Sequence, residues 1–462
     1  MPIRSGEPSP SDRRNTDLAL TQVGKTVKQR LGLGSRKWMV SGDNDMIWPH
    51  LAIGLLAYLV VNLHDSPARA SEALTVEQAV SIALKHNPDL LAARQELAIA
   101  QGREVKARLL NRFNPRVRSR IWNRHNPGSG NETDSQVFIQ QEVEVAGQRS
   151  LRIKTATRQR QRVEAQLRDR ERRLIGEVKR AYFRARMLQE QVRLRRTIEE
   201  LNRRIRDASK ARFEAGVAPI MEANLAAIRY GQSRKESLTA QAAFEAALAT
   251  LRRLLGWDRD RALVLAEPLR VVPRPVSLPD LLQRALTTRP DLVAAKHEIA
   301  RAQADIELTK RLIIPNPTFQ GFYNTETEGP GGTSTMLGGG ISIPLPLFDR
   351  KQGELIMQGG TLERSRHRLI AITRLIEQEV ETAFQTYEAA RRAVEVFETE
   401  VLDRIHENFR FIELAYREGK IGLLQLIVVQ DDLITAQLSY VESLGQFRQA
   451  QVDLEQAVGG TL

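Results

Sequence analysis

Long runs of the chain carry apolar residues at alternating spacings of four and three positions. In the first half of the chain these residues are Leu174, Val178, Ala181, Ala185, Leu188 and Val192. In the second half they are Ile376, Val380, Ala383, Tyr387, Ala390 and Val394, followed by Phe397 and Val401. This spacing is typical of a coiled-coil seam. It predicts a continuous helix over 149–215, and roughly 67 residues of helix would reach about 100 Å.

A second pattern, with a period of two, precedes each long helical run. The apolar positions are Val137, Ile139, Val143 and Val145, alternating with Gln136, Gln140, Glu142 and Glu144, and in the later stretch Leu337, Ile341, Ile343, Leu345 and Leu347. Each predicted strand pairs with an upstream strand, over 115–122 or 317–324, across the turn-rich segments 123–134 and 325–334. The pattern therefore predicts two β-hairpins. Such alternation fits the wall of an outer-membrane barrel, and it also fits an ordinary soluble hairpin.

The chain contains the same structural unit twice. At an offset of 202 positions, 74–115 matches 276–317 without a gap. The identical pairs include Pro88/Pro290, Asp89/Asp291, Leu90/Leu292, Asn114/Asn316 and Pro115/Pro317. The dipeptides Asn87-Pro88 and Arg289-Pro290 each divide a short helix from a longer one, because a residue before proline disfavours the helical conformation. A repeat of this kind determines the architecture of the whole chain.

Glycines mark the positions where the predicted helices reverse or end. The long helices end at Gly216 and Gly419, and shorter return helices end at Gly256 and Gly459, where glycine suits a C-cap. Each half is thus predicted to consist of a helix, a β-hairpin, a long helix and a return helix. The predicted segments are the first repeat at 71–258, a linker at 259–275 and the second repeat at 276–462.

Residues 1–70 are predicted to be an N-terminal extension with a secretory signal peptide. A basic stretch precedes an apolar run, and Ala68 and Ala70 form an A-x-A cleavage site, so the mature chain would begin at Ser71. The alternative is a retained membrane anchor, although the apolar run is short for a bilayer span and contains proline and glycine. Met39 and Met46 are alternative start positions.

Composition restricts the chemistry that the chain can perform. The absence of cysteine excludes disulfides, thiolate metal sites, cysteine nucleophiles and a lipidated N-terminal cysteine. The seven histidines show no ligand spacing, and no metal site or cofactor is predicted. The formal charge of +13 is interleaved with acidic residues, which favours a solvated surface over a nucleic-acid site. A hydrolase using the adjacent Asp431 and Asp432 is disfavoured, because neighbouring residues on a helix do not share a face.

The number of strands predicts an oligomer. Two hairpins supply four strands, whereas the smallest bacterial membrane barrels have about eight. An open sheet edge cannot face lipid, since its backbone groups would lack hydrogen-bond partners. Copies are therefore expected to assemble around an axis, and three protomers would supply twelve strands and twelve helical segments.

These features resemble the TolC family of outer membrane factors over essentially all of 74–458. The likeness rests on the duplicated Ala-Leu-x-x-x-Pro-Asp-Leu opening, the Asn-Pro entry to each hairpin, the strand exits Gly147-Gln148-Arg149 and Phe348-Asp349-Arg350, and an aromatic-x-x-Gly turn in each half. The resemblance implies a mainly α fold with a small β part. In it, a trimeric 12-stranded outer-membrane β-barrel is continued by a periplasmic α-helical coiled-coil barrel.

By this resemblance, the two glycine turns form the periplasmic tip that meets an adaptor protein. The tip residues are Phe213, Gly216 and Val217 in the first turn and Tyr416, Gly419 and Lys420 in the second. The simpler interpretation is that each glycine allows two helices to reverse. In the family a carboxylate and a tyrosine link the tip, and these positions fall on Glu222 and Tyr416. The family's gate arginine falls on Ile421 and its paired aspartates fall on Gln425 and Val428, so the chain departs from the pattern there.

The resemblance also implies a function and partners. The function is that of an outer-membrane exit channel in a tripartite efflux system, and no enzyme activity is implied. The partners would be two further copies of the chain, a periplasmic adaptor, an inner-membrane pump of the RND type and outer-membrane lipid, with no nucleic acid. The strand exits are most similar to the CzcC-type branch, which implies heavy-metal cations as cargo. The alternatives are drug efflux, type I protein secretion and, from another class, a soluble coiled-coil tether.

Overall fold

The computed structural model describes residues 73–461 apart from 127–129, 271–274 and 329–331. Residues 71–462 belong to one structural unit of the chain. The predicted signal peptide, with Ala68 and Ala70, lies outside the described residues, and its cleavage stays a prediction.

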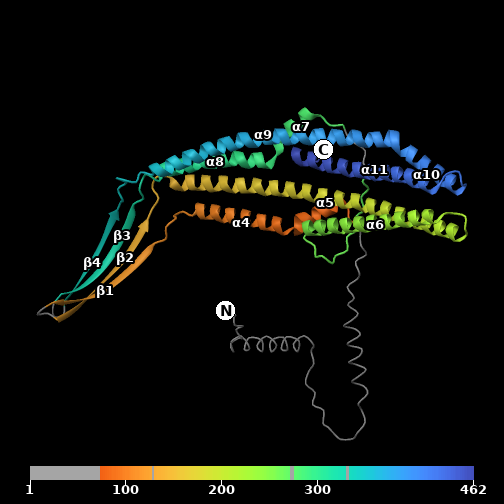
Figure 1. The fold of residues 1–462 in the computed structure, drawn as a ribbon. Helices are drawn as coiled ribbons and strands as arrows, with labels where there is room; N and C mark the ends of the chain where they lie inside the picture. Colours follow the sequence, from red (N-terminus) through yellow and green to blue (C-terminus); the bar gives the residue numbers. More distant parts are fainter. Residues whose placement is uncertain (1–72, 127–129, 271–274, 329–331, 462) are drawn as a thin grey trace, which may run out of the picture. The chain divides into compact units, whose positions relative to one another are not determined.

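Each half of the described chain follows the predicted order of elements (Figure 1). The first half comprises α3 (Val76–His86), α4 (Pro88–Arg108), β1 (Arg116–Asn126), β2 (Gly130–Glu142), α5 (Gln148–Glu214) and α6 (Ile220–Leu255). The second half comprises α7 (Leu278–Thr288), α8 (Pro290–Arg311), β3 (Thr318–Glu328), β4 (Gly332–Ser342), α9 (Gln352–Val396), the π-helical turn η1 (Phe397–Val401), α10 (Leu402–Arg417) and α11 (Leu423–Val458). Near the strands α4, α5, α8 and α9 lie side by side, and further along α5 contacts α6 and α11.

The junction between the short and long helices of each repeat has a local cause. Asn87 ends α3 and caps α4 with its side-chain oxygen, and Pro88 takes the first position of α4, where no amide hydrogen bond is lost. The Asn87 side-chain amide also donates to the Leu254 carbonyl at 2.9 Å. In the second repeat Arg289 replaces Asn87 and donates to the Ala457 carbonyl at 3.0 Å. Both junctions are thereby tied to the end of their own return helix.

The predicted apolar seams form the core of the helical part. Val178 and Ala185 of α5, and Ile376 and Val380 of α9, have 0% of their surface exposed. The α5 seam belongs to an apolar cluster with α3 and α6, and the α9 seam belongs to a second cluster with α7 and α11. The seam prediction is confirmed at these positions. Among the described residues, no helix combines the length and apolar character that a membrane span needs.

The two long helices differ in continuity. The helix predicted over 149–215 is observed as α5, with 67 residues. Its counterpart α9 has 45 residues and passes through η1 into α10. Phe397 and Val401 were expected to continue the seam, but they lie in this π-helical turn, whose wider repeat changes the helical phase. Glu398 in the turn accepts a hydrogen bond from the Tyr440 hydroxyl at 3.1 Å.

The two hairpins join into one antiparallel sheet with the strand order β1-β2-β3-β4. The pairing of β2 with β3 runs from Ser135 opposite Thr325 to Glu142 opposite Thr318, so the central contact of the sheet connects the two repeats. Within the described residues, β1 and β4 are edge strands. The described part of the chain therefore presents two open sheet edges.

The hairpin boundaries correct the expectation from sequence. The segments 123–134 and 325–334 were expected to be loops, but most of their described residues continue the strands. Polar side chains there pair across the ladder: the Thr133 hydroxyl donates to Asn123 at 3.0 Å. At the other end, the strands stop before the following predicted strand positions: Val143, Val145, Ile343, Leu345 and Leu347. The loops predicted from the turn-forming residues were too long, because cross-strand pairs hold most of these residues in the strands.

Candidate functional site

One face of the sheet is apolar and exposed. The cross-strand register places on it Val117, Ile121, Val137, Ile139, Phe319, Tyr323, Leu337 and Ile341. Each of these side chains is at least 39% exposed. An apolar surface of this kind normally meets protein or lipid. The strands have 11, 13, 11 and 11 residues, and about 9–11 residues suffice for a tilted strand to span a bilayer.

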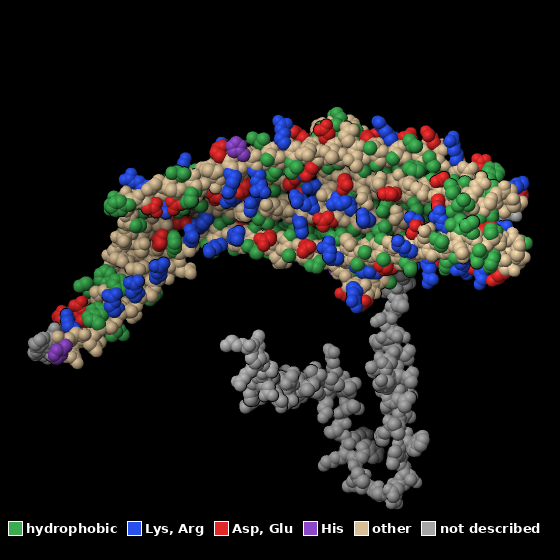
Figure 2. Space-filling view, in the orientation of Figure 1, with side chains coloured by type: hydrophobic (Ala, Val, Ile, Leu, Met, Phe, Trp, Pro, Cys, Tyr) green, Lys and Arg blue, Asp and Glu red, His purple; other side chains and the backbone are tan. Residues whose placement is uncertain are grey.

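The opposite face of the sheet is polar. On β1 it carries Arg116, Arg118, Arg120 and Arg124, and the residues paired with them on β2 are Gln140, Phe138, Gln136 and Glu132. Figure 2 shows Lys and Arg side chains following the strands on the face in view. Arg124 forms an ion pair with Glu132 at 3.0 Å. Strands that separate lipid from a water-filled lumen show the same division into an apolar and a polar face.

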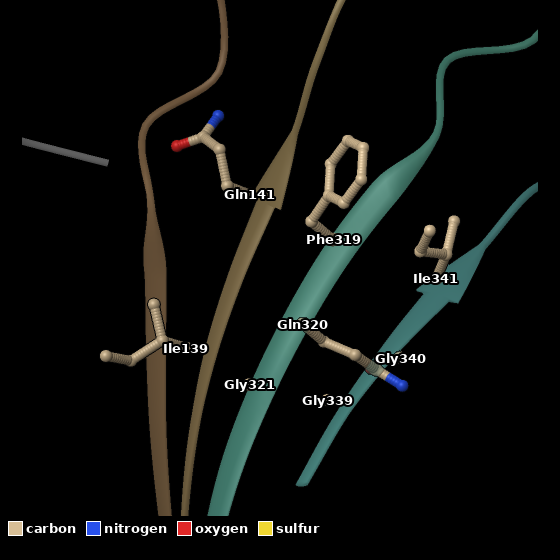
Figure 3. Close-up of a pocket in the computed structure, with 8 residues that line it drawn as sticks. All are labelled: Ile139, Gln141, Phe319, Gln320, Gly321, Gly339, Gly340 and Ile341. Atoms are coloured by element: carbon tan, nitrogen blue, oxygen red, sulfur yellow. The ribbon is translucent and has the colours of Figure 1, made fainter.

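The apolar face is not flat. A groove of about 550 Å³ lies between β2, β3 and β4 (Figure 3). Its floor contains Gly321 and Gly339, which are direct register partners and leave the backbone uncovered. Ile139, Phe319 and Ile341 stand beside these glycines. Backbone atoms therefore form part of the surface that this face presents.

At the end of the helices far from the strands, α5 and α10 each end in a turn, and the two turns have the same geometry. Gly216 and Gly419 both have a φ of 73°. The amides of Val217 and Lys420 each donate to the carbonyl five residues earlier, at 3.0 and 2.8 Å, which is the hydrogen bond of a Schellman motif. No atom lies within 4 Å of a Cβ built on either glycine. Glycine is therefore required by the left-handed backbone and not by lack of space.

The predicted tip residues lie around these two turns. Phe213 and Val217 are exposed, and Lys420 is exposed and forms an ion pair with Glu418. The structure adds further exposed apolar residues at the tip: Ile220, Met221, Leu414, Leu424 and Val428. Sequence reasoning missed most of them because periodicity alone did not show which side of the helix would stay uncovered. The tip is therefore a mainly apolar surface with the Lys420–Glu418 ion pair beside it.

The predicted tip link is formed by side chains in contact. The Tyr416 hydroxyl lies 3.4 Å from Glu222 Oε1, which is long for a hydrogen bond. Arg212, which the sequence analysis did not identify, donates to Glu222 Oε1 at 3.0 Å and to the Tyr416 hydroxyl at 3.3 Å. The carboxylate of Glu222 is mostly buried, whereas Arg212 is about half exposed. The link is thus a three-residue cluster centred on Arg212.

The remaining gate positions fall into two groups. Ile421 is half-buried and packs, together with Tyr416, against a small apolar cluster between α6 and α11. Gln425 and Val428 are exposed on α11. Asp431 forms an ion pair with Arg229 at 2.7 Å. The geometry is compatible with a mouth held by the Arg212 cluster and by packing of Ile421, and a gating role for these residues stays a proposal.

We expect Glu222→Gln to raise single-channel conductance in planar bilayers, and Tyr416→Phe to raise it less. A hydrogen bond to a charged group contributes about 1.5–3 kcal/mol, and the lower end corresponds to about a tenfold change in the closed-to-open ratio. Arg212→Gln should have an effect similar to that of Glu222→Gln. Combining two of these changes should add little, because the three residues share one interaction. Wild-type conductance in all three single variants would assign closure to packing at Ile421.

Comparisons with known proteins agree with this architecture. The family described as outer membrane efflux protein matches residues 79–257 and 281–460. The cobalt-zinc-cadmium resistance protein CzcC of Cupriavidus metallidurans is 26% identical over 394 residues, which cover 85% of this chain and 92% of CzcC. The pyoverdine export outer membrane protein OpmQ of Pseudomonas aeruginosa is 24% identical over 300 residues, which cover 62% of this chain and 61% of OpmQ.

The fold is also found among solved structures. The open-state structure of the MtrE outer membrane channel of Neisseria gonorrhoeae matches with a TM-score of 0.68 and 18% identity. The match covers 83% of this chain and 89% of MtrE. At this level of identity the likeness establishes the fold alone.

Proposed function

Because the chain belongs to the outer membrane efflux protein family, we propose that it forms the exit duct of a tripartite efflux system. Members of this family are transport channels of the outer membrane and not enzymes. The finer proposal concerns assembly, partners and cargo. Three copies would form one duct that receives cargo from an inner-membrane pump and a periplasmic adaptor and releases it outside the cell.

The sheet is the observation that carries this proposal. Its apolar face suits lipid and its polar face suits a water-filled lumen, but its edges β1 and β4 are open. Because unpaired backbone groups are not tolerated in the hydrocarbon region, β1 of one copy would pair with β4 of the next. Three copies related by rotation would close a barrel of twelve strands, and α5 and its neighbours would continue the wall into the periplasm.

The tip supports the proposal of an adaptor as partner. It combines exposed apolar side chains with the Lys420–Glu418 ion pair, and clustered apolar side chains on a surface often mark a protein-binding site. The adaptor would contact Phe213, Val217 and the two glycine turns. The pump is proposed to be of the RND type, as the family resemblance of the sequence implies.

The cargo is proposed to be heavy-metal cations. CzcC, whose name refers to cobalt, zinc and cadmium resistance, aligns with 85% of this chain. The similarity to OpmQ, named for pyoverdine export, favours a second candidate in which the duct serves organic compounds. Growth of a deletion strain on zinc, cobalt and cadmium, compared with growth on organic toxicants, distinguishes the two. Sensitivity restricted to organic toxicants would contradict the metal proposal.

We expect the mature protein to begin at Ser71 and to fractionate with the outer membrane as a trimer. The A-x-A site predicts the cleavage, and four strands with two open edges require partner copies. N-terminal sequencing and chemical crosslinking of outer-membrane extracts measure both properties. A cytosolic monomer that retains Met1 would refute the proposal.

A further inference from the structure

A basic cavity lies where the helices meet the strands. It has a volume of about 520 Å³ and lies between the strand-proximal ends of α4, α5 and α8, within the size range of ligand pockets. Its basic lining residues are Arg103, Lys106, Arg112, Arg152, Arg162 and Arg301. None of its lining residues, all of which lie in the described part of the chain, is acidic. We refer to it as the junction cavity.

Three of the basic residues form ion pairs with carboxylates that do not line the cavity. Arg152 pairs with Glu144, Arg162 pairs with Glu298, and Arg301 pairs with both Glu298 and Asp305. The pairing is incomplete, because the Nε atom of Arg162 is buried and donates to no acceptor among the described residues. A buried donor without an acceptor is destabilising. Because this atom is enclosed by protein, it adds positive charge beside the cavity without itself reaching a ligand there.

The other three basic residues carry uncompensated charge. Within the described chain, Arg103 and Lys106 of α4 have no carboxylate within 4 Å. The guanidinium group of Arg112 lies over the ring of Phe113. Arg103 and Lys106 are three positions apart, so both lie on the same side of α4. Three positive charges around one cavity attract an anion more strongly than isolated surface charges do.

The chemistry of the lining favours a phosphate group. Guanidinium groups match the oxygens of phosphate in a bidentate arrangement, and lysine adds a compact positive charge. A phosphate offers several strong acceptors, which suits a site with many donors and no acidic side chain. Basic pockets between membrane-protein helices bind phospholipid headgroups by the same chemistry.

We propose that the junction cavity binds the phosphate group of an anionic ligand, and that this ligand is a phospholipid headgroup of the periplasmic leaflet. The choice of lipid rests on the proposed function, because a sheet that spans the outer membrane places the junction at the periplasmic surface of the bilayer. A soluble phosphate ester carries the same group and is the other source to be tested.

The test measures binding by calorimetry on the full mature protein in nonionic detergent at low salt. The probes are dihexanoylphosphatidylglycerol, dihexanoylphosphatidylcholine and glycerol 3-phosphate. The variant is Arg103→Gln/Lys106→Gln, which removes two exposed charges that have no protein partner and so leaves the fold intact. The matched control is Arg170→Gln/Arg184→Gln, which removes two exposed charges from α5 outside the cavity.

We expect phosphatidylglycerol to bind the wild type and the control alike, and to bind the cavity variant at least tenfold more weakly. Phosphatidylcholine should bind poorly to all three proteins. Binding of glycerol 3-phosphate as tight as that of phosphatidylglycerol, and lost in the same variant, would support the phosphate site and assign it to a soluble ligand. Equal binding by the cavity variant and the control would overturn the proposal. Binding is measured without transport, so a protein that binds but does not reach the outer membrane would refute the proposed function alone.

Discussion

Gly419→Val is expected to abolish export while the protein still reaches the outer membrane. Gly419 has a φ of 73°, and a β-branched residue held in such a conformation costs about 1–3 kcal/mol. A Cβ at this position would meet no atom within 4 Å, so the whole effect comes from the backbone. The turn would relax to another conformation and displace Lys420 and the exposed apolar residues of the tip. Resistance to the exported compound should fall to the level of a deletion strain.

Two control variants test this explanation. Gly419→Asn should retain most of the resistance, because asparagine adopts the left-handed conformation more readily than other residues with a Cβ. Gly231→Val changes a glycine inside α6 that has open space and no positive φ, so it should behave as wild type. Gly216→Val should reproduce the defect, since its turn has the same geometry. Full resistance in Gly419→Val would show that the shape of the turn is not needed for export.

Asp291→Asn is expected to lower the free energy of unfolding by about 3 kcal/mol, because removing one partner of a buried ion pair leaves an uncompensated charge. Arg289 is 2% exposed and forms two hydrogen bonds with the Asp291 carboxylate, at 3.1 and 2.6 Å. Glu379 is a further partner of Arg289, but its side chain is far more exposed, so it compensates only in part. Chemical denaturation of the purified protein, followed by helical circular dichroism at neutral pH, measures the change.

The first repeat supplies a matched control. Asp89 occupies the position equivalent to Asp291 at the start of α4, but it is exposed. The residue two positions before it is Asn87, whereas the residue two positions before Asp291 is Arg289. Both carboxylates interact favourably with a helix N-terminus, which contributes about 0.3–1 kcal/mol. Asp89→Asn should therefore cost no more than that amount. Equal losses in the two variants would show that the ion pair with Arg289 adds nothing to stability.

The same pair makes stability depend on pH. Burial disfavours the charged form of Asp291, but the hydrogen bonds and the charge of Arg289 outweigh it and hold the pKa of the carboxyl below its ordinary value. A depressed pKa stabilises the folded state fully above the unfolded pKa of about 3.9. The contribution is lost as the pH falls from there through the folded pKa. Asp291→Asn should therefore differ less from the wild type in acid than at neutral pH.

Features set by local sequence could be predicted. The seam spacing predicted α5 because apolar positions three and four apart share a helix face, and that face is buried at Val178 and Ala185. The glycine turns were predictable because few other residues adopt a positive φ. The repeat offset located the second copy of each element, including the junctions at Asn87 and Arg289.

Features set by contacts between distant segments could not be predicted. Arg212 lies one turn before Gly216, and nothing in its own neighbourhood indicates that it reaches Tyr416 in the other repeat. The residues of the junction cavity come from three helices and from the segment that follows α4, so no spacing in the sequence brings them together. The π-helical turn is in contact with Tyr440, a residue of the return helix. Each of these contacts joins segments that lie far apart in the sequence and meet only in the folded chain.

The central strand pair of the sheet has a consequence for biogenesis. The side chains of Gln140 in β2 and Gln320 in β3 hydrogen bond at 3.3 Å, although 180 positions separate them in the chain. Contacts between such distant segments form slowly, because a long loop must close first. Each hairpin can pair its own strands, but the apolar face of the sheet becomes continuous only after the second repeat has been synthesised and β3 has paired with β2. The aggregation-prone surface is then completed late in folding, which shortens the time it spends in water before insertion.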